Sequence, residues 1–193
     1  DLKGQSAMMR AAILVFEHHP SFSMISFITQ WGITRLADED WTTGQSNGHP
    51  VPSTGMRIVG KVFKEVEATP TVDVALKAAP ILAEALKHSP YNMNNQRYKA
   101  IVYRIMGKKD KAIEIYLRLI SKHRQSYLFH ELSNLLDDEQ QKIALLCKAI
   151  SSQREEKFRQ RMRYTLAGLL FSRDKARAKY ELDKCIAARK QAG

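Results

Sequence analysis

The sequence contains few residues that interrupt helices and few that form crosslinks. Only nine glycines and six prolines occur in 193 residues, and four of the prolines lie before residue 71. Because neither residue is well tolerated inside a helix, the second half of the chain is suited to helices. The two cysteines, Cys147 and Cys185, are far apart and belong to no ligand-spaced motif. They argue against a disulfide framework, and a reducing compartment fits their number.

Long apolar runs and targeting signals are also missing. The longest apolar runs, such as AAILVF at residues 11–16, are far too short to span a bilayer. The chain starts at Asp1 with no basic region and no cleavage-like site, so it shows no secretory signal. We expect a cytoplasmic protein, and the missing initiator Met indicates a piece of a longer chain. Hydrophobic residues make up 44% of the sequence, which favours a folded domain over a disordered one.

Residues arranged for catalysis are absent from the pattern as well. The sequence has no phosphate-cradling glycine loop and no nucleotide fingerprint. Its six histidines are scattered, and His130 has only Ser133 and Asn134 at the spacing where a helical metal site places its ligands. Cys147 would need a base and an electropositive pocket to act as a nucleophile, and a buried structural thiol is the simpler interpretation. We therefore expect no metal, no cofactor and no enzymatic activity.

Positive charge is what the sequence has in excess. The net charge is +11, and between Lys148 and Lys190 thirteen Lys or Arg residues stand against five Asp or Glu residues. A basic end of this kind can attract nucleic acid or an acidic partner. The alternative interpretation is a solvated face of packed helices, which charge runs usually indicate.

Apolar residues at helical spacing predict helices along most of the chain, and no segment shows the alternation of a strand. Pro80 falls inside one of these helices and predicts a kink or a break there. The predicted helices cover residues 5–18, 22–36, 55–67, 72–88, 92–106, 109–120, 127–136, 139–151, 152–169 and 174–189.

Residues 37–54 form the one long segment without helical periodicity. It contains two Gly, two Pro and several Ser or Thr residues, which predicts a long functional or mobile loop. Trp41 in this loop either binds a ligand or is buried against a neighbouring helix pair and pins the loop. Ser53 or Thr54 is placed to cap the helix that follows.

Turn and cap signals divide the second half into three helix pairs. Gly107 follows the first predicted helix of this half, where a positive φ costs glycine little. Asp138 with Gln141, and Ser152 with Glu155, have the spacing of capping boxes. Helices joined by a few residues pack antiparallel, so each pair is expected to form a hairpin.

The second helices of the three pairs align with one another at shifts of 30 and 34 residues. This period is typical of stacked helix pairs. The aligned triplets are Ala112/Tyr116/Leu119, Lys142/Leu146/Ala149 and Ala176/Tyr180/Asp183.

The first pair resembles the tetratricopeptide repeat (TPR) family. The family pattern asks for a large residue, a turn glycine, a small residue and an aromatic, and these positions hold Tyr103, Gly107, Ala112 and Tyr116. The match is degenerate, because Gln96 stands where the family often has Trp and Arg124 where it often has Pro. The resemblance covers about residues 92–190 and implies a TPR-like solenoid.

Four short stretches extend the resemblance to a narrower group. They are EDW at 39–41, ALLCKAI at 144–150, EEKF at 155–158 and ARAKYEL at 176–182. These stretches resemble the helical segment of bacterial proteins linked to TOTE conflict systems, in which a cold-shock or S1-like domain commonly follows. The resemblance implies a part in a defence-type assembly that handles nucleic acid, although no cold-shock sequence is present here.

These observations predict an all-α fold in which antiparallel helix hairpins stack as a TPR-like α-solenoid. We expect an N-terminal helical region at 1–90, with its loop at 37–54, and about three degenerate repeats at 91–193. The two regions can also form one continuous helical domain.

The predicted function is a non-enzymatic scaffold that binds a protein or peptide partner in a concave groove. The alternative is a nucleic-acid-associated module that uses the basic C-terminal helices, where i, i+4 pairs share a helical face. Phe171 and Tyr164 are near these pairs, and Phe171 is as readily a core residue as a stacking platform. The partner-binding residues predicted for the groove are Arg97, Arg104 and Asn134, and those predicted for the basic end are Arg159, Arg163, Lys175 and Lys179.

Overall fold

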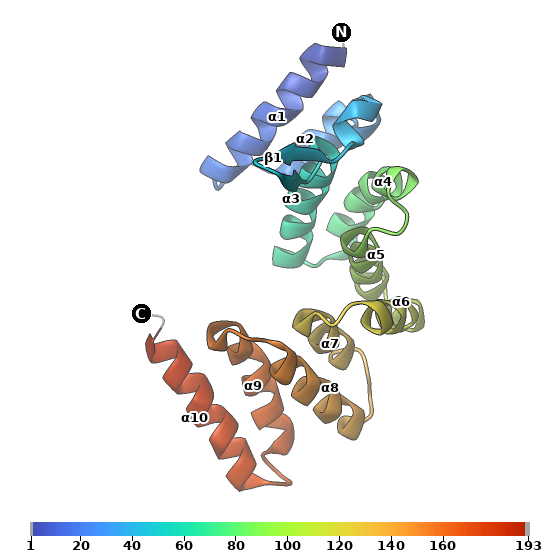
Figure 1. Cartoon of the computed structure of the whole chain (residues 1–193). Coiled ribbons are helices and arrows are strands. Elements are labelled where there is room, and N and C mark those ends of the chain that lie inside the picture. Colours follow the sequence, from blue (N-terminus) through green and yellow to red (C-terminus); the bar gives the residue numbers. More distant parts are fainter. Residues whose placement is uncertain (1, 192–193) are drawn as a thin grey trace. The chain divides into compact units, whose positions relative to one another are not determined.

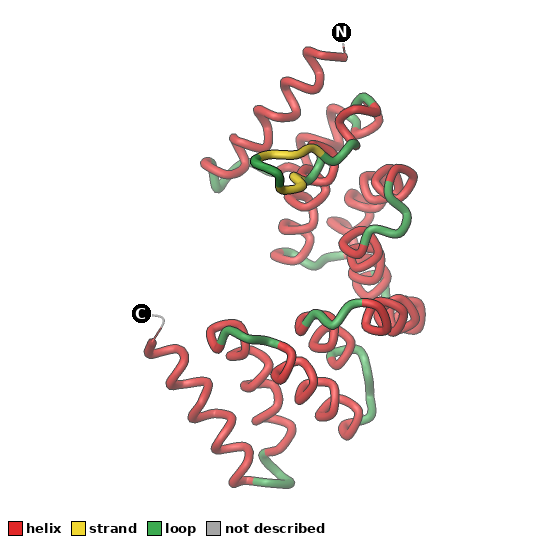
Figure 2. The backbone as a smooth tube through the Cα atoms, viewed as in Figure 1, coloured by secondary structure: helices red, strands yellow, loops and turns green. Residues whose placement is uncertain are grey.

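The computed structural model describes residues 2–191, which fold into ten α-helices, two short 3-10 helices and one β-hairpin (Figures 1 and 2). The prediction of an all-α fold is therefore confirmed. The α-helices are α1 (Leu2–His18), α2 (Met24–Trp31), α3 (Thr54–Ala68), α4 (Val72–His88), α5 (Met93–Ile105), α6 (Lys109–Lys122), α7 (Ser126–Ser133), α8 (Glu139–Ser152), α9 (Glu156–Leu170) and α10 (Lys175–Gln191).

The chain packs as two compact units that divide between Lys108 and Lys109. The predicted boundary near residue 90 concerns where the repeats begin, and it stays a prediction. The first pair predicted from the sequence joins α5 and α6, which belong to different units, so this pairing also stays a prediction.

Helix α3 is the centre of the first unit. It contacts α1, α2 and α4, and α5 packs on α4. Five fully buried apolar residues of α3 recur at helical spacing and give the helix one broad apolar face. They are Ile58, Val59, Val62, Phe63 and Val66. Phe63 also stacks on Tyr98 of α5, with ring centroids 4.2 Å apart.

The segment 37–54 is more ordered than predicted. A 3-10 helix, η2, covers Asp38–Trp41, and strands β1 (Gly44–Ser46) and β2 (His49–Val51) pair antiparallel. The expectation of no strand was therefore wrong. The turn consists of Asn47 and Gly48, both at positive φ (51° and 76°), which is the backbone that suits a tight hairpin.

Two helix predictions in the first unit were wrong in detail. The predicted helix 22–36 stops at Trp31, because Gly32 adopts a φ of 80° and the next residues form a separate 3-10 helix, Ile33–Arg35. Of the kink or break predicted at Pro80, the kink stays a prediction, and the break is wrong, because α4 continues from Val72 to His88 with the proline inside it. Its exposed position leaves the ring free of neighbouring core side chains.

The cap predictions had mixed outcomes. Ser53 caps α3 by accepting a hydrogen bond from the Met56 amide at 3.2 Å, as expected. Asp138 caps α8 in the same way through the Gln141 amide at 2.7 Å. Ser152 does not start a helix; it is the last residue of α8, and its hydroxyl donates to the Lys148 carbonyl at 2.7 Å.

The second unit is a succession of helices in which each contacts the next along the chain. Figure 1 shows α7 with α8, and α9 with α10, as antiparallel neighbours, which confirms the second and third predicted pairs. Their buried side chains form one apolar cluster across these helices. It comprises Phe129, Leu146, Ala149, Met162, Leu166, Leu170 and Ala178.

The repeat alignment fails in the last helix. Ala112, Tyr116 and Leu119 are buried as predicted, whereas the aligned residues of α10 are exposed. The buried residues of α10 are instead Ala178, Glu181 and Ala188. The helix packs on α9 with a face rotated from the repeat phase, so its Tyr180 is left 54% exposed.

Candidate functional site

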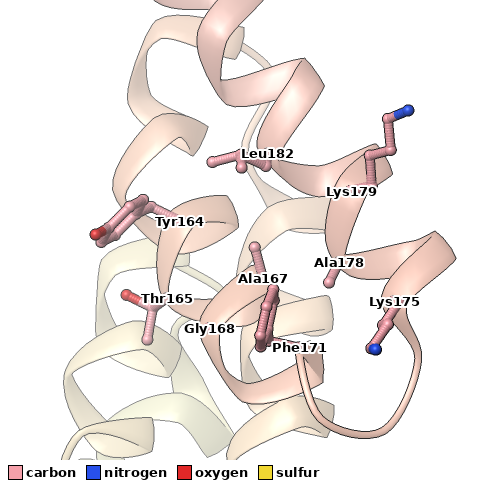
Figure 3. Close-up of a pocket in the computed structure, with 9 residues that line it drawn as sticks. All are labelled: Tyr164, Thr165, Ala167, Gly168, Phe171, Lys175, Ala178, Lys179 and Leu182. Carbon is pink, nitrogen blue, oxygen red and sulfur yellow. The ribbon is translucent and has the colours of Figure 1, made fainter.

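A mainly apolar groove lies between α9 and α10 on the open face of the last hairpin (Figure 3). Its volume is about 610 Å³. Figure 3 shows Tyr164 and Leu182 toward one end and Phe171 with Lys175 toward the other, beside the loop that joins the helices. The groove is lined by Tyr164, Thr165, Ala167, Gly168, Phe171, Lys175, Ala178, Lys179 and Leu182. We call it the α9–α10 groove.

Helix α9 has two apolar faces, and only one is packed in the second unit. Met162, Leu166 and Leu170 are buried, at a spacing of four residues. Tyr164 and Phe171 lie seven residues apart on another face and are 67% and 70% exposed. Because large aromatic groups favour burial, two of them held in water along one groove mark this face as unusual.

Helix α10 forms the second wall with a different composition. Lys175, Lys179 and Leu182 follow the i, i+4, i+7 spacing that places them on one face. Figure 3 shows the Lys179 side chain extending away from the ribbon and the Lys175 side chain pointing toward the side of Phe171. Among the described residues, neither lysine is in an ion pair, so their charges are available to an incoming group.

A buried ion-pair network holds the two walls together. Arg163 of α9 donates to Glu156 at 2.6 Å and to Glu181 of α10, and Arg163 and Glu181 are 7% and 6% exposed. Burial disfavours the charged guanidinium, but the hydrogen bonds to Glu156 and Glu181 outweigh it and raise the pKa of Arg163. The Arg163 hydrogen bond, helped by that of Arg159, lowers the pKa of Glu156. The network fixes the distance between the walls.

The floor of the groove contains Gly168, a position where a larger side chain would meet no steric obstacle. Gly168 is exposed inside α9, and a Cβ added there would have no neighbouring atom within 4 Å. In an exposed helix interior glycine is about 1 kcal/mol less favourable than alanine. Ala167 beside it is also small. The result is a stretch of α9 where the backbone is open to close approach.

A second hollow continues from the groove past Tyr164, which lines both. Its volume is about 510 Å³ and it carries three cations, Lys157, Arg161 and Arg189. Phe158 adds an aromatic ring over which the Lys157 amine lies, 4.8 Å from the centroid. Basic side chains therefore flank the apolar centre at both ends of the hairpin.

The residues predicted for a concave groove are in different surroundings. Arg97 is half-buried and forms an ion pair with Glu67. Arg104 is half-buried in α5, and Asn134 is the exposed C-cap residue of α7. Their role in partner binding stays a prediction.

The residues predicted for the basic end do not share one surface. Arg163 is buried in the ion-pair network, and Arg159 donates to the Gln153 carbonyl at 2.7 Å and pairs with Glu156. Lys175 and Lys179 line the α9–α10 groove. The structure thus brings the two lysines together and assigns the two arginines to structural contacts, and partner binding by any of the four stays a prediction.

Sequence reasoning did not find Gly168, Leu182 or the exposed position of Phe171 as parts of a site. The signal was the spacing Tyr164, Gly168, Phe171, which marks one helical face. It was obscured because the intervening leucines also show helical spacing. In the described part of the chain, no three metal-ligating side chains come together and no helix is long and apolar enough to cross a membrane.

Three solved structures resemble the chain in fold. They are MamA (TM-score 0.51, 14% identity, 72% of this chain and 91% of that one), BtubC from P. vanneervenii (0.57, 14%, 100% and 92%) and a Podosopora anserina kinesin light chain-like protein with nearly identical TPR-like repeats (0.53, 16%, 99% and 96%). At these identities the likeness shows the fold alone, and it confirms a TPR-like helical solenoid. The model of a protein family described as Domain of unknown function (DUF7017) matches residues 96–193. No curated protein matches the sequence.

Proposed function

The chain belongs to the family described as Domain of unknown function (DUF7017), and from this premise we propose that it is a non-enzymatic protein–protein interaction scaffold. The proposed binding surface is the α9–α10 groove, which lies inside the part of the chain that the family model covers. The observation that carries the proposal is the pair of exposed aromatic side chains, Tyr164 and Phe171, along one groove.

Three properties of the groove support binding of a polypeptide. Aromatic side chains are enriched in the centres of protein interfaces, where they supply large contact areas. Stacked helix pairs leave extended surfaces open to partners, and TPR-like repeats have this architecture. The walls stand on two helices joined by the buried Arg163–Glu181 pair, so the surface is preorganised before a partner arrives.

The test is selection of helical peptides from a displayed library against the wild-type chain. Binding of the selected peptides should fall by about tenfold or more in Phe171→Ser, because the substitution removes an anchor of the groove. The matched control is Leu117→Ser, which changes a residue of α6 that is also exposed (52%) but does not line the groove. Circular dichroism checks that each variant is folded. Peptides that bind Phe171→Ser as well as the wild type would place the binding surface elsewhere.

The second hollow favours a second candidate function, association with nucleic acid. Lys157, Arg161 and Arg189 could neutralise phosphates, while Phe158 offers a stacking surface. Such binding should weaken steeply with salt and should be lost when Arg161 and Arg189 are changed to Gln. A gel shift with single-stranded RNA at low salt tests it, and the absence of retardation would contradict it.

From the sequence resemblance to conflict-system proteins, we further propose that the scaffold works within a defence-type assembly. In that setting the scaffold would hold a component of a bacterial defence system. The test is the neighbourhood of the natural coding sequence and whether that sequence continues into a cold-shock-like domain. A neighbourhood without nucleic-acid-processing genes would remove the defence role and leave the scaffold proposal intact.

A further inference from the structure

We infer that the α9–α10 groove binds an amphipathic helix of a partner protein that carries acidic residues beside its apolar anchors. This inference rests on the proposed scaffold function and names the chemistry of the partner. Four observations carry it: the shape of the walls, the open floor, the sign of the unpaired charge, and the chemistry of the lining.

The walls are two antiparallel helical faces of similar length. Tyr164, Gly168 and Phe171 recur at i, i+4, i+7 along α9, and Lys175, Lys179 and Leu182 recur at the same spacing on α10. Faces of this spacing are what a third helix packs against when its own side chains interdigitate with them. At 1.5 Å per residue, the lining segments Tyr164–Phe171 and Lys175–Leu182 each offer about 12 Å of contact, which is about two turns of a helix. The second hollow extends this surface along α9 to Lys157.

The open floor favours a helix over an extended peptide. At Gly168 a Cβ would meet nothing within the chain, and the residue has neither a positive φ nor a packed neighbour to require glycine. Small residues allow the backbones of two helices to approach closely. A partner helix lying over Gly168 and Ala167 would supply the missing contact and account for a glycine at an otherwise unfavourable position.

The unpaired charges at the groove have one sign. Lys175 and Lys179 are exposed, and in the part of the chain described here neither is in an ion pair. Two acidic residues nearby in sequence have partners within the chain. Asp174 accepts a hydrogen bond from the Arg177 amide at 2.9 Å, and Glu181 is buried against Arg163. Asp183 is exposed on α10 outside the lining. An acidic partner is therefore the complementary one.

The second hollow, at the other end of the hairpin, is also positively charged. Lys157, Arg161 and Arg189 line it, and Tyr164 connects it with the α9–α10 groove. Among the described residues, Arg161 and Arg189 are in no ion pair. A partner helix that spans both hollows would therefore place acidic residues on either side of its apolar anchors.

The chemistry of the lining favours a polypeptide over a nucleic acid in this groove. Between Tyr164 and Phe171 the surface consists of four apolar or small residues, Ala167, Gly168, Ala178 and Leu182, and one hydroxyl residue, Thr165. Aliphatic side chains complement apolar side chains, whereas a phosphate backbone needs cations along its whole track. The lysines stand on one wall only, so they can select a sign of charge but cannot line such a track.

The experiment measures fluorescence anisotropy of the full chain with designed helical peptides of about 18 residues, a length that covers the walls. The first peptide has Leu and Phe anchors at i, i+3, i+4 and i+7, flanked by Glu. The second has the same anchors with every Glu changed to Lys, and the third keeps Glu but has Ser in place of the anchors. We expect the first to bind at least about tenfold more tightly than either of the others.

Charge reversal of the groove gives the decisive comparison. In a Lys175→Glu/Lys179→Glu variant the preference for the Glu peptide over the Lys peptide should fall by about tenfold or more, because only the cations of the second hollow remain. The matched control is Lys108→Glu/Lys111→Glu, which reverses two lysines that do not line the groove and should leave the preference unchanged. Gly168→Leu, which fills the floor, should weaken the first peptide by about tenfold or more, whereas Leu117→Ser should not.

The outcomes separate this inference from the proposed function. Equal or tighter binding of the Lys peptide to the wild type overturns the acidic partner but leaves a peptide-binding groove. Competition by single-stranded RNA that is stronger than that of the first peptide also overturns it, as does a concentration-dependent dimer lost in Phe171→Ser. If no peptide binds and library selection also yields no groove-dependent binder, the scaffold proposal itself fails.

Discussion

The indole ring of Trp41 lies directly against the backbone of Gly55 in the first turn of α3. A Cβ atom added at Gly55 would fall within 2.7 Å of three indole carbons, closer than side chains approach one another. Trp41 also stacks on His88, with ring centroids 4.6 Å apart and planes 6° apart, and it is only 7% exposed. Of the two interpretations of Trp41, burial against a neighbouring helix pair is the one that the structure bears out.

Replacing Gly55 with Ala should destabilise the first unit. The added methyl group has no space unless Trp41 or α3 moves, and overpacking of this kind typically costs about 1–3 kcal/mol. Urea denaturation followed by tryptophan fluorescence measures the change. The native fluorescence should also shift, because the indole would be pushed from its contact with His88.

Gly60→Ala in the same helix is the matched control, and it is expected to increase the free energy of unfolding, whereas Gly55→Ala is expected to decrease it. A Cβ at Gly60 would meet only the Tyr98 hydroxyl, at 3.9 Å, so the substitution should stabilise α3 by about 0.5–1 kcal/mol. If Gly55→Ala were as stable as the wild type, the close packing of Trp41 on this position would be wrong.

Removing Arg163 should destabilise the second unit more than removing an exposed cation does. Arg163→Met leaves the buried carboxylate of Glu181 without its partner, and breaking a buried pair in this way costs about 3–5 kcal/mol. The double variant Arg163→Met/Glu181→Met should recover most of that loss, because the uncompensated charge is gone. Urea denaturation of the four members of this cycle measures the coupling. Additive losses would show that the two side chains act independently.

Much of the helical architecture could be predicted from the sequence because apolar spacing and caps act locally. Asp138 caps α8 and Gly107 has a φ of 73°, as their positions indicated. The ends of α2 and the hairpin were missed for a local reason too. A glycine at positive φ, such as Gly32, can end a helix, and an Asn-Gly pair, such as Asn47-Gly48, favours a tight hairpin turn.

The candidate site was less predictable because burial depends on neighbouring helices. Arg163 and Lys179 look alike in sequence, but one meets two glutamates inside the hairpin and the other lines the groove. Nothing local distinguishes Phe171, which is exposed, from Leu170, which is in the core. Which of these residues are buried depends on the rotation of α10 about its axis relative to α9, and the repeat pattern does not predict that rotation.

The stability of the second unit should fall as the pH is lowered below about 6.5 because of His130. Burial lowers the pKa of His130 in the folded chain from its ordinary value of 6.5, and the positive charge of Arg161 lowers it further. In this interval the unfolded chain binds a proton that the folded chain does not, so the free energy of unfolding decreases until the pH reaches the folded pKa. Thermal unfolding of the wild type and of His130→Gln, between pH 7 and about pH 5, measures the difference.

Arg161→Gln separates the two causes of that pH dependence. Without the nearby guanidinium the pKa of His130 in the folded chain should be less depressed, so the loss of stability should be smaller than in the wild type. An identical pH dependence in the wild type and in His130→Gln would show that other groups are responsible.

Pro80→Ala should stabilise the first unit, because the proline lies inside the continuous helix α4 and is exposed. Proline offers no amide hydrogen to the carbonyl of Leu76, and in a helix interior it is about 3 kcal/mol less favourable than alanine. Alanine also makes the unfolded chain more flexible, which offsets about 0.4–1 kcal/mol of the gain. We therefore expect a net stabilisation of about 2–2.6 kcal/mol, seen as a higher melting temperature.

Pro70→Ala is the control for the effect on the unfolded chain. Pro70 lies in the turn between α3 and α4, outside both helices, so alanine there gives no new helical hydrogen bond. Its expected effect is a small loss of stability, about 0.4–1 kcal/mol. Opposite signs for the two substitutions would show that helix strain at Pro80 is relieved. A loss of stability in Pro80→Ala would instead mean that Ile81 and Leu82 need the backbone geometry that the proline imposes to remain in the core.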